Sequence, residues 1–144
     1  MGSNASPRSI TTRLAEMTMV EPGFLEQRFH AGAKLDLGGF QENKEARFRL
    51  CGDSPYLMLS VMPSDIDFEV RITTTDHFAP ERGKDLLIAL AVVAQDNVAE
   101  MVTKLYFSYF PQTFRLCVFN GEDEARAWLM LQREEVLGSE KAGA

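Results

Sequence analysis

Two short segments near the start of the chain alternate apolar and polar residues. In Leu14–Glu21 the apolar Met17 and Met19 alternate with polar neighbours, and this period of two is typical of a strand with one buried face. Pro22 and Gly23 then favour a turn, and Phe24–His30 resumes the strand pattern. The pattern therefore predicts an antiparallel hairpin.

Strands and helices alternate in the rest of the chain. Three apolar runs are typical of strands buried on both faces: Pro55–Met62, Leu87–Ala94 and Thr113–Phe119. Amphipathic or capped segments between and after them predict helices: Gly39–Leu50, His77–Leu86, Val98–Phe110 and Gly121–Arg133. Because this alternation is typical of parallel strands joined by helical crossovers, we expect an α/β fold. Its mixed sheet has an N-terminal antiparallel hairpin and parallel central strands.

The expected helix at Val98–Phe110 carries more apolar residues than one helix face can bury. Its inward stripe is predicted from helical spacing: Val98, Met101, Val102, Leu105 and Tyr109. Tyr106 and Phe107 fall outside the stripe, whereas Phe110 folds under the helix end. Two interpretations of Tyr106, Phe107, Tyr109 and Phe110 stay open. They belong to a wide core-facing helix, or they form a dimer contact or the mouth of an apolar pocket.

Composition and charge narrow the range of partners. The 144 residues include 15 Lys and Arg against 21 Asp and Glu, a net charge of -6, so nucleic acid and anionic membrane surfaces are not expected partners. No run of about 18 apolar residues occurs, so no membrane span is expected. Two cysteines and two histidines make neither a disulfide framework nor a structural zinc site.

The chain is expected to form one domain at residues 13–133. Residues 1–12 (MGSNASPRSITT) are small and polar and in part resemble vector-derived sequence, so we expect them to be disordered. Residues 134–144 are expected to be a disordered tail. The absence of a secretory pattern and the two unpaired thiols predict a cytoplasmic protein.

The chain shows no motif for catalysis. It lacks G-x-S-x-G, a glycine-rich phosphate loop, H-E-x-x-H and a dinucleotide fingerprint. His30 and His77, the residues that titrate near neutral pH, are expected to face solvent. Asp65 and Asp67 offer too few oxygens for a divalent cation. We therefore expect no enzyme, no catalytic residue, no metal and no cofactor.

The carboxy-terminal half resembles a known family. The runs LIALAVVA, NVAEMVTKLYFSYF and TFRLCVFNGEDEARAWL are similar to those of the bacterial STAS / SpoIIAA-like domains. The most telling part is Val118–Leu129, a strand, a short acidic turn and an A-x-x-W-L helix. The resemblance extends over residues 15–131. It implies a mixed sheet with an opening hairpin and with helices mainly on one face.

The resemblance also implies a phosphorylation switch. The family's best understood members are anti-anti-sigma factors, which bind a kinase-type partner and are switched off by phosphorylation of a Ser or Thr in a D-S-x-G-like element. The corresponding region here is Ser64–Asp76, which offers Ser64, Thr73, Thr74 and Thr75 but no D-S-x-G. The other interpretation of these hydroxyls is that they cap a helix or satisfy a turn.

Two functions follow from these observations. The first is a non-catalytic regulatory or protein-interaction module of the STAS type, which binds a protein partner or a second copy of itself. The alternative is a carrier that holds a small apolar molecule or a lipid in a cavity between the sheet and the helices. An enzyme that uses scattered carboxylates is a third class, and it would need an enclosed cleft with two convergent titratable groups.

Overall fold

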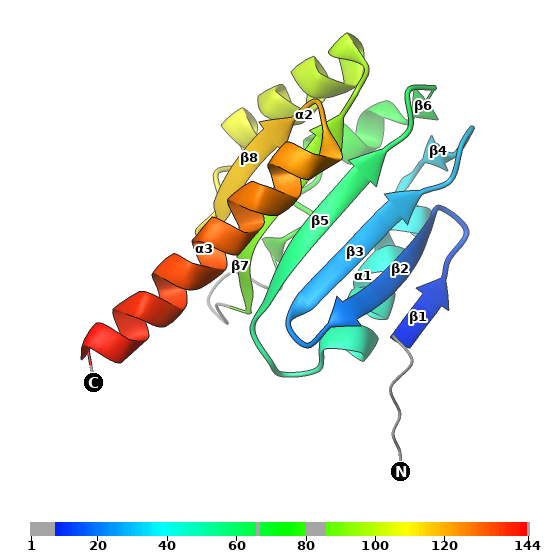
Figure 1. The fold of residues 1–144 in the computed structure, drawn as a ribbon. Coiled ribbons are helices and arrows are strands. Elements are labelled where there is room, and N and C mark those ends of the chain that lie inside the picture. The colour runs from blue at the N-terminus through cyan, green and yellow to red at the C-terminus, as the bar shows by residue number, and fades with distance from the viewer. Residues whose placement is uncertain (1–7, 66, 80–85, 144) are drawn as a thin grey trace.

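The core of the molecule is a twisted mixed sheet with helices on both faces (Figure 1). The computed structural model describes residues 8–65, 67–79 and 86–143. Within these residues the sheet has six strands in the order β1-β2-β3-β5-β7-β8. Their bounds are Arg8–Thr11 for β1, Ala15–Glu21 for β2, Phe24–Phe29 for β3, Tyr56–Met62 for β5, Leu87–Ala94 for β7 and Arg115–Phe119 for β8.

The other elements are α1 (Leu37–Cys51), α2 (Asn97–Tyr109), α3 (Glu122–Gly143) and the 3₁₀ helix η1 (Val70–Thr74). Two short strands, β4 (Lys34–Leu35) and β6 (Asp67–Phe68), pair in parallel outside the main sheet. Asp36 begins α1, because its carboxylate accepts a hydrogen bond from the backbone N–H of Gly39. Gly52 ends the helix with a positive φ of 61°, a conformation that glycine adopts without strain.

The pairing of the strands confirms the predicted sheet. β2 and β3 form the antiparallel hairpin, with Ala15 opposite Phe29. β5 runs parallel to β3 on one side and to β7 on the other, and β8 continues the parallel part beyond β7. The three apolar runs therefore lie side by side and point the same way, as the mixed α/β class requires.

The alternation of side chains along the strands divides the core in two. On one face, Leu25 and Met58 pack with residues of α1, and α2 covers the same face (Figure 1). On the other face, Leu57 and Leu59 pack against Ala125 and Leu129 of α3. Two of the three helices thus share a face, as predicted. All residues of β5 except Met62 are buried, as is typical of a strand in the middle of a parallel sheet.

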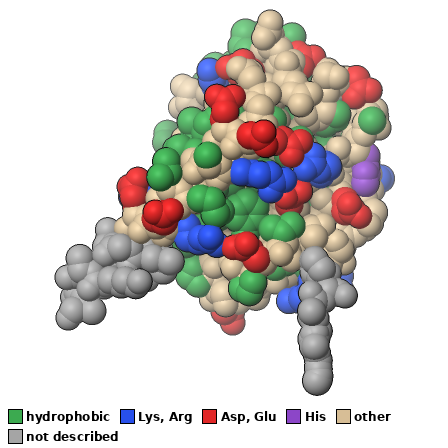
Figure 2. All heavy atoms as spheres, viewed as in Figure 1, with side chains coloured by type: hydrophobic (Ala, Val, Ile, Leu, Met, Phe, Trp, Pro, Cys, Tyr) green, Lys and Arg blue, Asp and Glu red, His purple; other side chains and the backbone are tan. Residues whose placement is uncertain are grey.

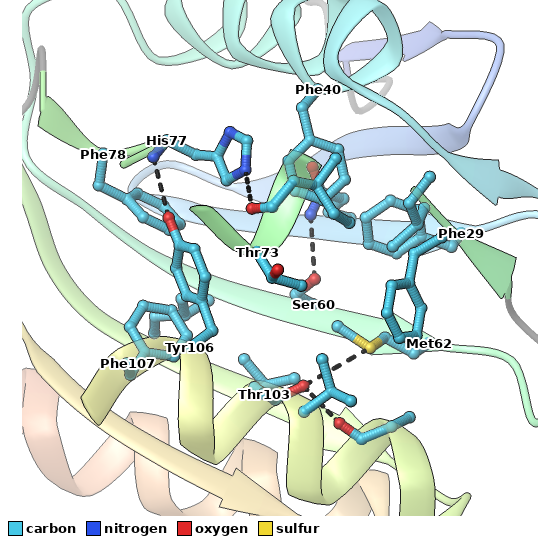
Figure 3. A pocket seen from close by; sticks show the side chains of 18 of the residues that line it. Phe29, Phe40, Ser60, Met62, Thr73, His77, Phe78, Thr103, Tyr106 and Phe107 are labelled. Atoms are coloured by element: carbon cyan, nitrogen blue, oxygen red, sulfur yellow. Dashed lines mark hydrogen bonds between the residues drawn. The ribbon is translucent and has the colours of Figure 1, made fainter. Parts of the chain in front are cut away.

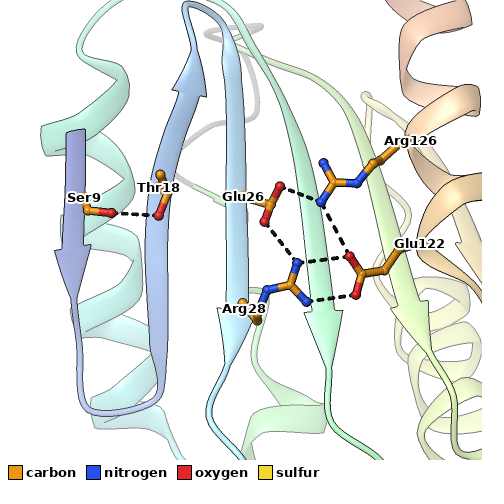
Figure 4. Close-up of polar contacts among 6 residues, drawn as sticks. All are labelled: Ser9, Thr18, Glu26, Arg28, Glu122 and Arg126. Atoms are coloured by element: carbon orange, nitrogen blue, oxygen red, sulfur yellow. Dashed lines mark hydrogen bonds and ion pairs between the residues drawn. The ribbon is translucent and has the colours of Figure 1, made fainter. Parts of the chain in front are cut away.

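Ion pairs among four charged side chains join the start of α3 to β3. Arg28 binds both carboxylate oxygens of Glu122, at 2.9 and 3.0 Å, and Arg126 lies 2.7 Å from Glu26 (Figure 4). The Arg28 guanidinium lowers the pKa of Glu122. Acidic and basic side chains accordingly lie next to one another on this face of the molecule (Figure 2). We interpret the group as a structural fastening, because its charges pair with one another.

The structure differs from the prediction at both ends of the domain. Residues 8–11, expected to be disordered, form β1, and Arg8 donates hydrogen bonds to the carbonyls of Arg49 and Leu50 at the end of α1. These carbonyls have no partner within the helix, so Arg8 ties the strand to it. α3 continues to Gly143, where a tail was expected from residue 134. Most of the helix expected at His77–Leu86 lies outside the described residues.

The close packing of α1 on the hairpin generates a stability prediction. A Cβ atom on Gly39 would lie 2.3 Å from Cδ1 of the buried Leu14, whereas a Cβ on Gly38 would meet nothing closer than 3.8 Å. We expect Gly39→Ala to lower the free energy of unfolding by about 1–3 kcal/mol through overpacking. Gly38→Ala, the matched control in the same helical turn, should leave it unchanged or slightly raised. Urea denaturation measures both, and equal stabilities of the two variants would contradict the packing.

Candidate functional site

The two helices on the shared face stand over opposite parts of the sheet and leave a cavity between them. α1 packs chiefly on β1 and β2, and α2 on β7, β8 and η1. Over β3 and β5, between the helices, lies a cavity of about 120 Å³. Its floor consists of side chains from three neighbouring strands, among them Phe29, Met58, Ser60 and Val92 (Figure 3). The cavity is therefore a consequence of where the helices lie.

α2 forms one wall of the cavity, with small, aliphatic and aromatic side chains. Ala99, Val102, Thr103, Tyr106 and Phe107 line the cavity. Ala99 and Thr103 are buried, and their small size lets the helix approach the sheet. The Thr103 hydroxyl donates to the carbonyl of Ala99 at 2.7 Å, so it is satisfied within the helix.

Four of the five residues of the predicted inward stripe of α2 are wrongly placed. Val102 lines the cavity as an inward residue would, whereas Val98, Met101, Leu105 and Tyr109 lie at the surface, with Met101 62% and Tyr109 73% exposed. Because apolar residues cover more than half of the circumference of the helix, spacing alone did not fix which half faces the sheet. Of the four aromatic candidates, Tyr106 and Phe107 line the cavity, Tyr109 faces solvent and Phe110 packs on Tyr106 at 5.1 Å between ring centroids.

A histidine and a tyrosine form the roof of the cavity. The His77 ring lies between Phe40 of α1, at 4.5 Å, and Tyr106 of α2, at 5.7 Å between centroids. The Tyr106 hydroxyl accepts from the backbone N–H of His77 at 2.9 Å and donates to the Thr75 carbonyl at 2.7 Å. The expectation that His77 faces solvent is wrong, because these rings half-bury it. The segment after η1 is thus bound to α2.

The surroundings of the His77 ring lower its pKa and so favour its neutral form. Burial lowers the pKa of this imidazole, the neighbouring Lys44 and Arg47 lower it further, and only a hydrogen bond to the Ile72 carbonyl opposes them. That bond joins Nε2 to the carbonyl oxygen at 2.8 Å. Because a carbonyl oxygen only accepts, Nε2 carries the proton.

The predicted phosphorylation candidates lie in two places. The hydroxyls of Thr73, Thr74 and Thr75 donate to carbonyls of η1, at 2.6, 3.1 and 3.0 Å. They therefore satisfy a turn, as the second interpretation of these residues expected. Ser64 lies exposed in the turn between β5 and β6. Phosphorylation of any of the four stays a prediction.

The sequence analysis missed a buried chain of polar side chains that ends at the cavity. Thr12 donates to Asn43, Asn43 donates to Gln27 at 3.4 Å, and Gln27 donates to Ser60 at 2.9 Å. All four residues are buried. A signal was present in the sequence: Gln27 shares the buried face of β3 with Leu25 and Phe29, and Ser60 interrupts an apolar strand.

Two further classes of site are not found in the part of the chain that the structure describes. Over these residues no group of three His, Cys, Asp or Glu side chains is placed to hold a metal ion. No helix among them combines the length and the apolar character that crossing a bilayer requires. The apolar cavity is therefore the feature on which a function can be argued.

Comparison with known proteins places the chain in a family. The model of a domain of unknown function, DUF7793, matches residues 18–132. The chain belongs to the DUF7793 family. No curated protein matches the sequence. A crystal structure of an uncharacterized protein from the DUF3478 family, with a SpoIIAA-like fold and from Shewanella loihica PV-4, is similar over 90% of this chain and 98% of that one. The TM-score is 0.53 and the identity 16%, so the likeness confirms the predicted SpoIIAA-like fold of this DUF7793 chain.

The buried histidine generates a pH prediction. Because the pKa of His77 is lowered in the folded state from its ordinary 6.5, the unfolded chain binds this proton first as the pH falls. The contribution of His77 is therefore complete above pH 6.5 and is lost progressively below it. We expect the free energy of unfolding to fall between pH 7 and about 5, and to fall less in His77→Gln. Denaturation at several pH values measures this, and an equal fall in both proteins would contradict it.

Proposed function

We propose that this protein is a non-catalytic binding module that takes a small apolar molecule into the cavity between its sheet and its helices. The cavity carries the proposal. Its walls are aliphatic and aromatic side chains from β3, β5, β7, α1 and α2, and the polar groups among them are few. Sites for small molecules commonly have this composition.

The size of the cavity limits the molecule. An engineered cavity of roughly 150 Å³ lined by apolar side chains stays dry and binds benzene. The cavity here, of about 120 Å³, accordingly suits a body of about one six-membered ring. An unfilled apolar space costs folding stability, so a ligand that fills it stabilises the folded state by mass action.

The surroundings of His77 support a binding role over catalysis. The Nε2 atom of its ring is hydrogen-bonded to the backbone carbonyl of Ile72. A histidine that acts as a general base on a nucleophile would lie within hydrogen-bond distance of that nucleophile. The lowered pKa of His77 favours its neutral form, which contributes to the apolar character of the roof. We place this role in the cytoplasm, where a cysteine that forms no disulfide, such as Cys117, stays reduced.

A cavity-filling substitution tests the proposal. Val102 lines the cavity, whereas Val98 on the same helix is exposed. With the methionine methyl groups labelled for NMR, benzene should shift the signals of Met58 and Met62, which line the cavity. Val102→Trp should weaken benzene binding at least tenfold, because the indole occupies the space, and the control Val98→Trp should not. Benzene that shifts neither methionine in the wild type would overturn the proposal.

A second candidate function, the protein-interaction module that the family resemblance implies, is supported by the outward face of α2. Val98, Met101, Leu105 and Tyr109 form an exposed apolar stripe along it. We propose a second copy of this chain as the occupant. In an antiparallel pair of α2 helices related by a two-fold axis, Met101 lies opposite Leu105 of the copy and Val98 lies near its Tyr109, so the stripe complements itself.

Sedimentation velocity tests this contact. The wild type should dimerise with increasing concentration, and Leu105→Lys should stay monomeric because it would bury an unpaired ammonium in the contact. Val70→Lys is the control, since Val70 is exposed but lies outside α2. A wild type that is monomeric at the highest concentrations would remove the self-association, and dimers of equal stability in Leu105→Lys would place the contact elsewhere.

A further inference from the structure

The chemistry of the cavity floor narrows the kind of molecule that fits. This inference rests on the proposed function and concerns Ser60, which is 4% exposed and points into the cavity from β5 (Figure 3). Ser60 Oγ accepts a hydrogen bond from Gln27 Nε2 at 2.9 Å. Within the described residues, its own proton has no acceptor.

The polar chain makes this proton a better donor. Each link from Thr12 through Asn43 and Gln27 to Ser60 donates toward the cavity. Hydrogen bonds that run in one direction polarise one another, so the last hydroxyl in the series donates more strongly than an isolated one. A buried donor without an acceptor destabilises the folded state. An acceptor atom on the ligand would remove that destabilisation.

The other hydroxyl and imidazole donors that line the cavity already donate hydrogen bonds to backbone carbonyls. The Thr103 hydroxyl donates to Ala99, the Thr73 hydroxyl to Val70, the Tyr106 hydroxyl to Thr75 and His77 Nε2 to Ile72. The free donors of the floor are therefore the Ser60 hydroxyl and the second amide proton of the adjacent Gln27. The two donor atoms are neighbours, 2.9 Å apart, so both lie in the same part of the floor.

The charge of the ligand is also constrained. No Lys, Arg, Asp or Glu is among the described residues that line the cavity, and the surroundings of His77 favour its neutral form. A carboxylate or an ammonium group would lose its hydration there without a partner of opposite charge. A neutral oxygen, such as the carbonyl of a ketone, ester or lactone, accepts from Ser60 without that penalty.

We infer that the cavity binds a small, neutral, carbonyl-bearing molecule whose apolar body fills the space beneath His77 and Tyr106 and whose oxygen accepts a hydrogen bond from Ser60.

Two ring compounds of the same shape test the inference. Cyclohexanone has a carbonyl oxygen where methylenecyclohexane has a CH₂ group. In Ser60→Ala the Gln27 amide is freed and can replace the lost donor, so the double variant Q27M/S60A, which removes both, is measured beside it. We expect the double variant to bind cyclohexanone about 3- to 10-fold more weakly, the loss of one net hydrogen bond. It should bind methylenecyclohexane within about twofold of the wild type.

The second probe and a matched variant keep the outcomes separate. Thr103→Val removes a hydroxyl that lines the cavity but already donates its proton to the Ala99 carbonyl. This variant should therefore change the affinities for both probes by the same factor. Titration of the Met58 and Met62 methyl signals measures each affinity. Equal weakening of both probes in Q27M/S60A, or no weakening of cyclohexanone, would overturn the inference while leaving the apolar site intact. Binding of neither probe to the wild type would overturn the proposed function and the inference with it.

Discussion

The cavity exists because two helices on one face of the sheet stand over opposite parts of it. α1 packs over the hairpin strands and α2 over β7 and β8, so the strands between them carry side chains that no helix covers directly. In a sandwich of tightly packed layers these positions would be filled. Here the rings of Phe40, His77 and Tyr106 line one side of the space, and about 120 Å³ stays open.

The roof depends on one hydroxyl group. Tyr106 joins α2 to the segment after η1 by accepting from His77 and donating to Thr75. Within η1, the Val70 and Arg71 carbonyls accept from three threonine hydroxyls, and the Ile72 carbonyl accepts from His77. The roof is therefore held by hydrogen bonds, whereas the floor is held by the strand pairing of a parallel sheet. The space over β3 and β5 stays open in a sheet otherwise filled with Leu, Val and Met, and the proposed binding role rests on it.

The sequence predicted the strands better than it predicted the cavity. The alternating pattern of the hairpin and the three apolar runs predicted the strands of the mixed sheet correctly. Such patterns are informative because a shift of one residue in the register of a strand would expose its core side chains. The rotation of α2 could not be predicted, because its apolar residues surround most of the helix and its two buried residues, Ala99 and Thr103, carry no strong hydrophobic signal. Of the predicted stripe, Val102 lines the cavity. The position of His77 and the hydrogen-bond chain to Ser60 depend on contacts between residues far apart in the sequence, which periodicity does not report. β1 was missed because its polar residues lie at a sheet edge, where Arg8 binds the end of α1.

A crystal structure of the protein under xenon pressure would show whether the space between β5 and α2 exists, because xenon occupies dry apolar cavities and needs no hydrogen bond. We expect a xenon atom in contact with Met58 and Val102 and beneath the Tyr106 ring. If these side chains met and closed the space, or if no xenon bound there, the cavity would not exist and the proposed binding site would be lost.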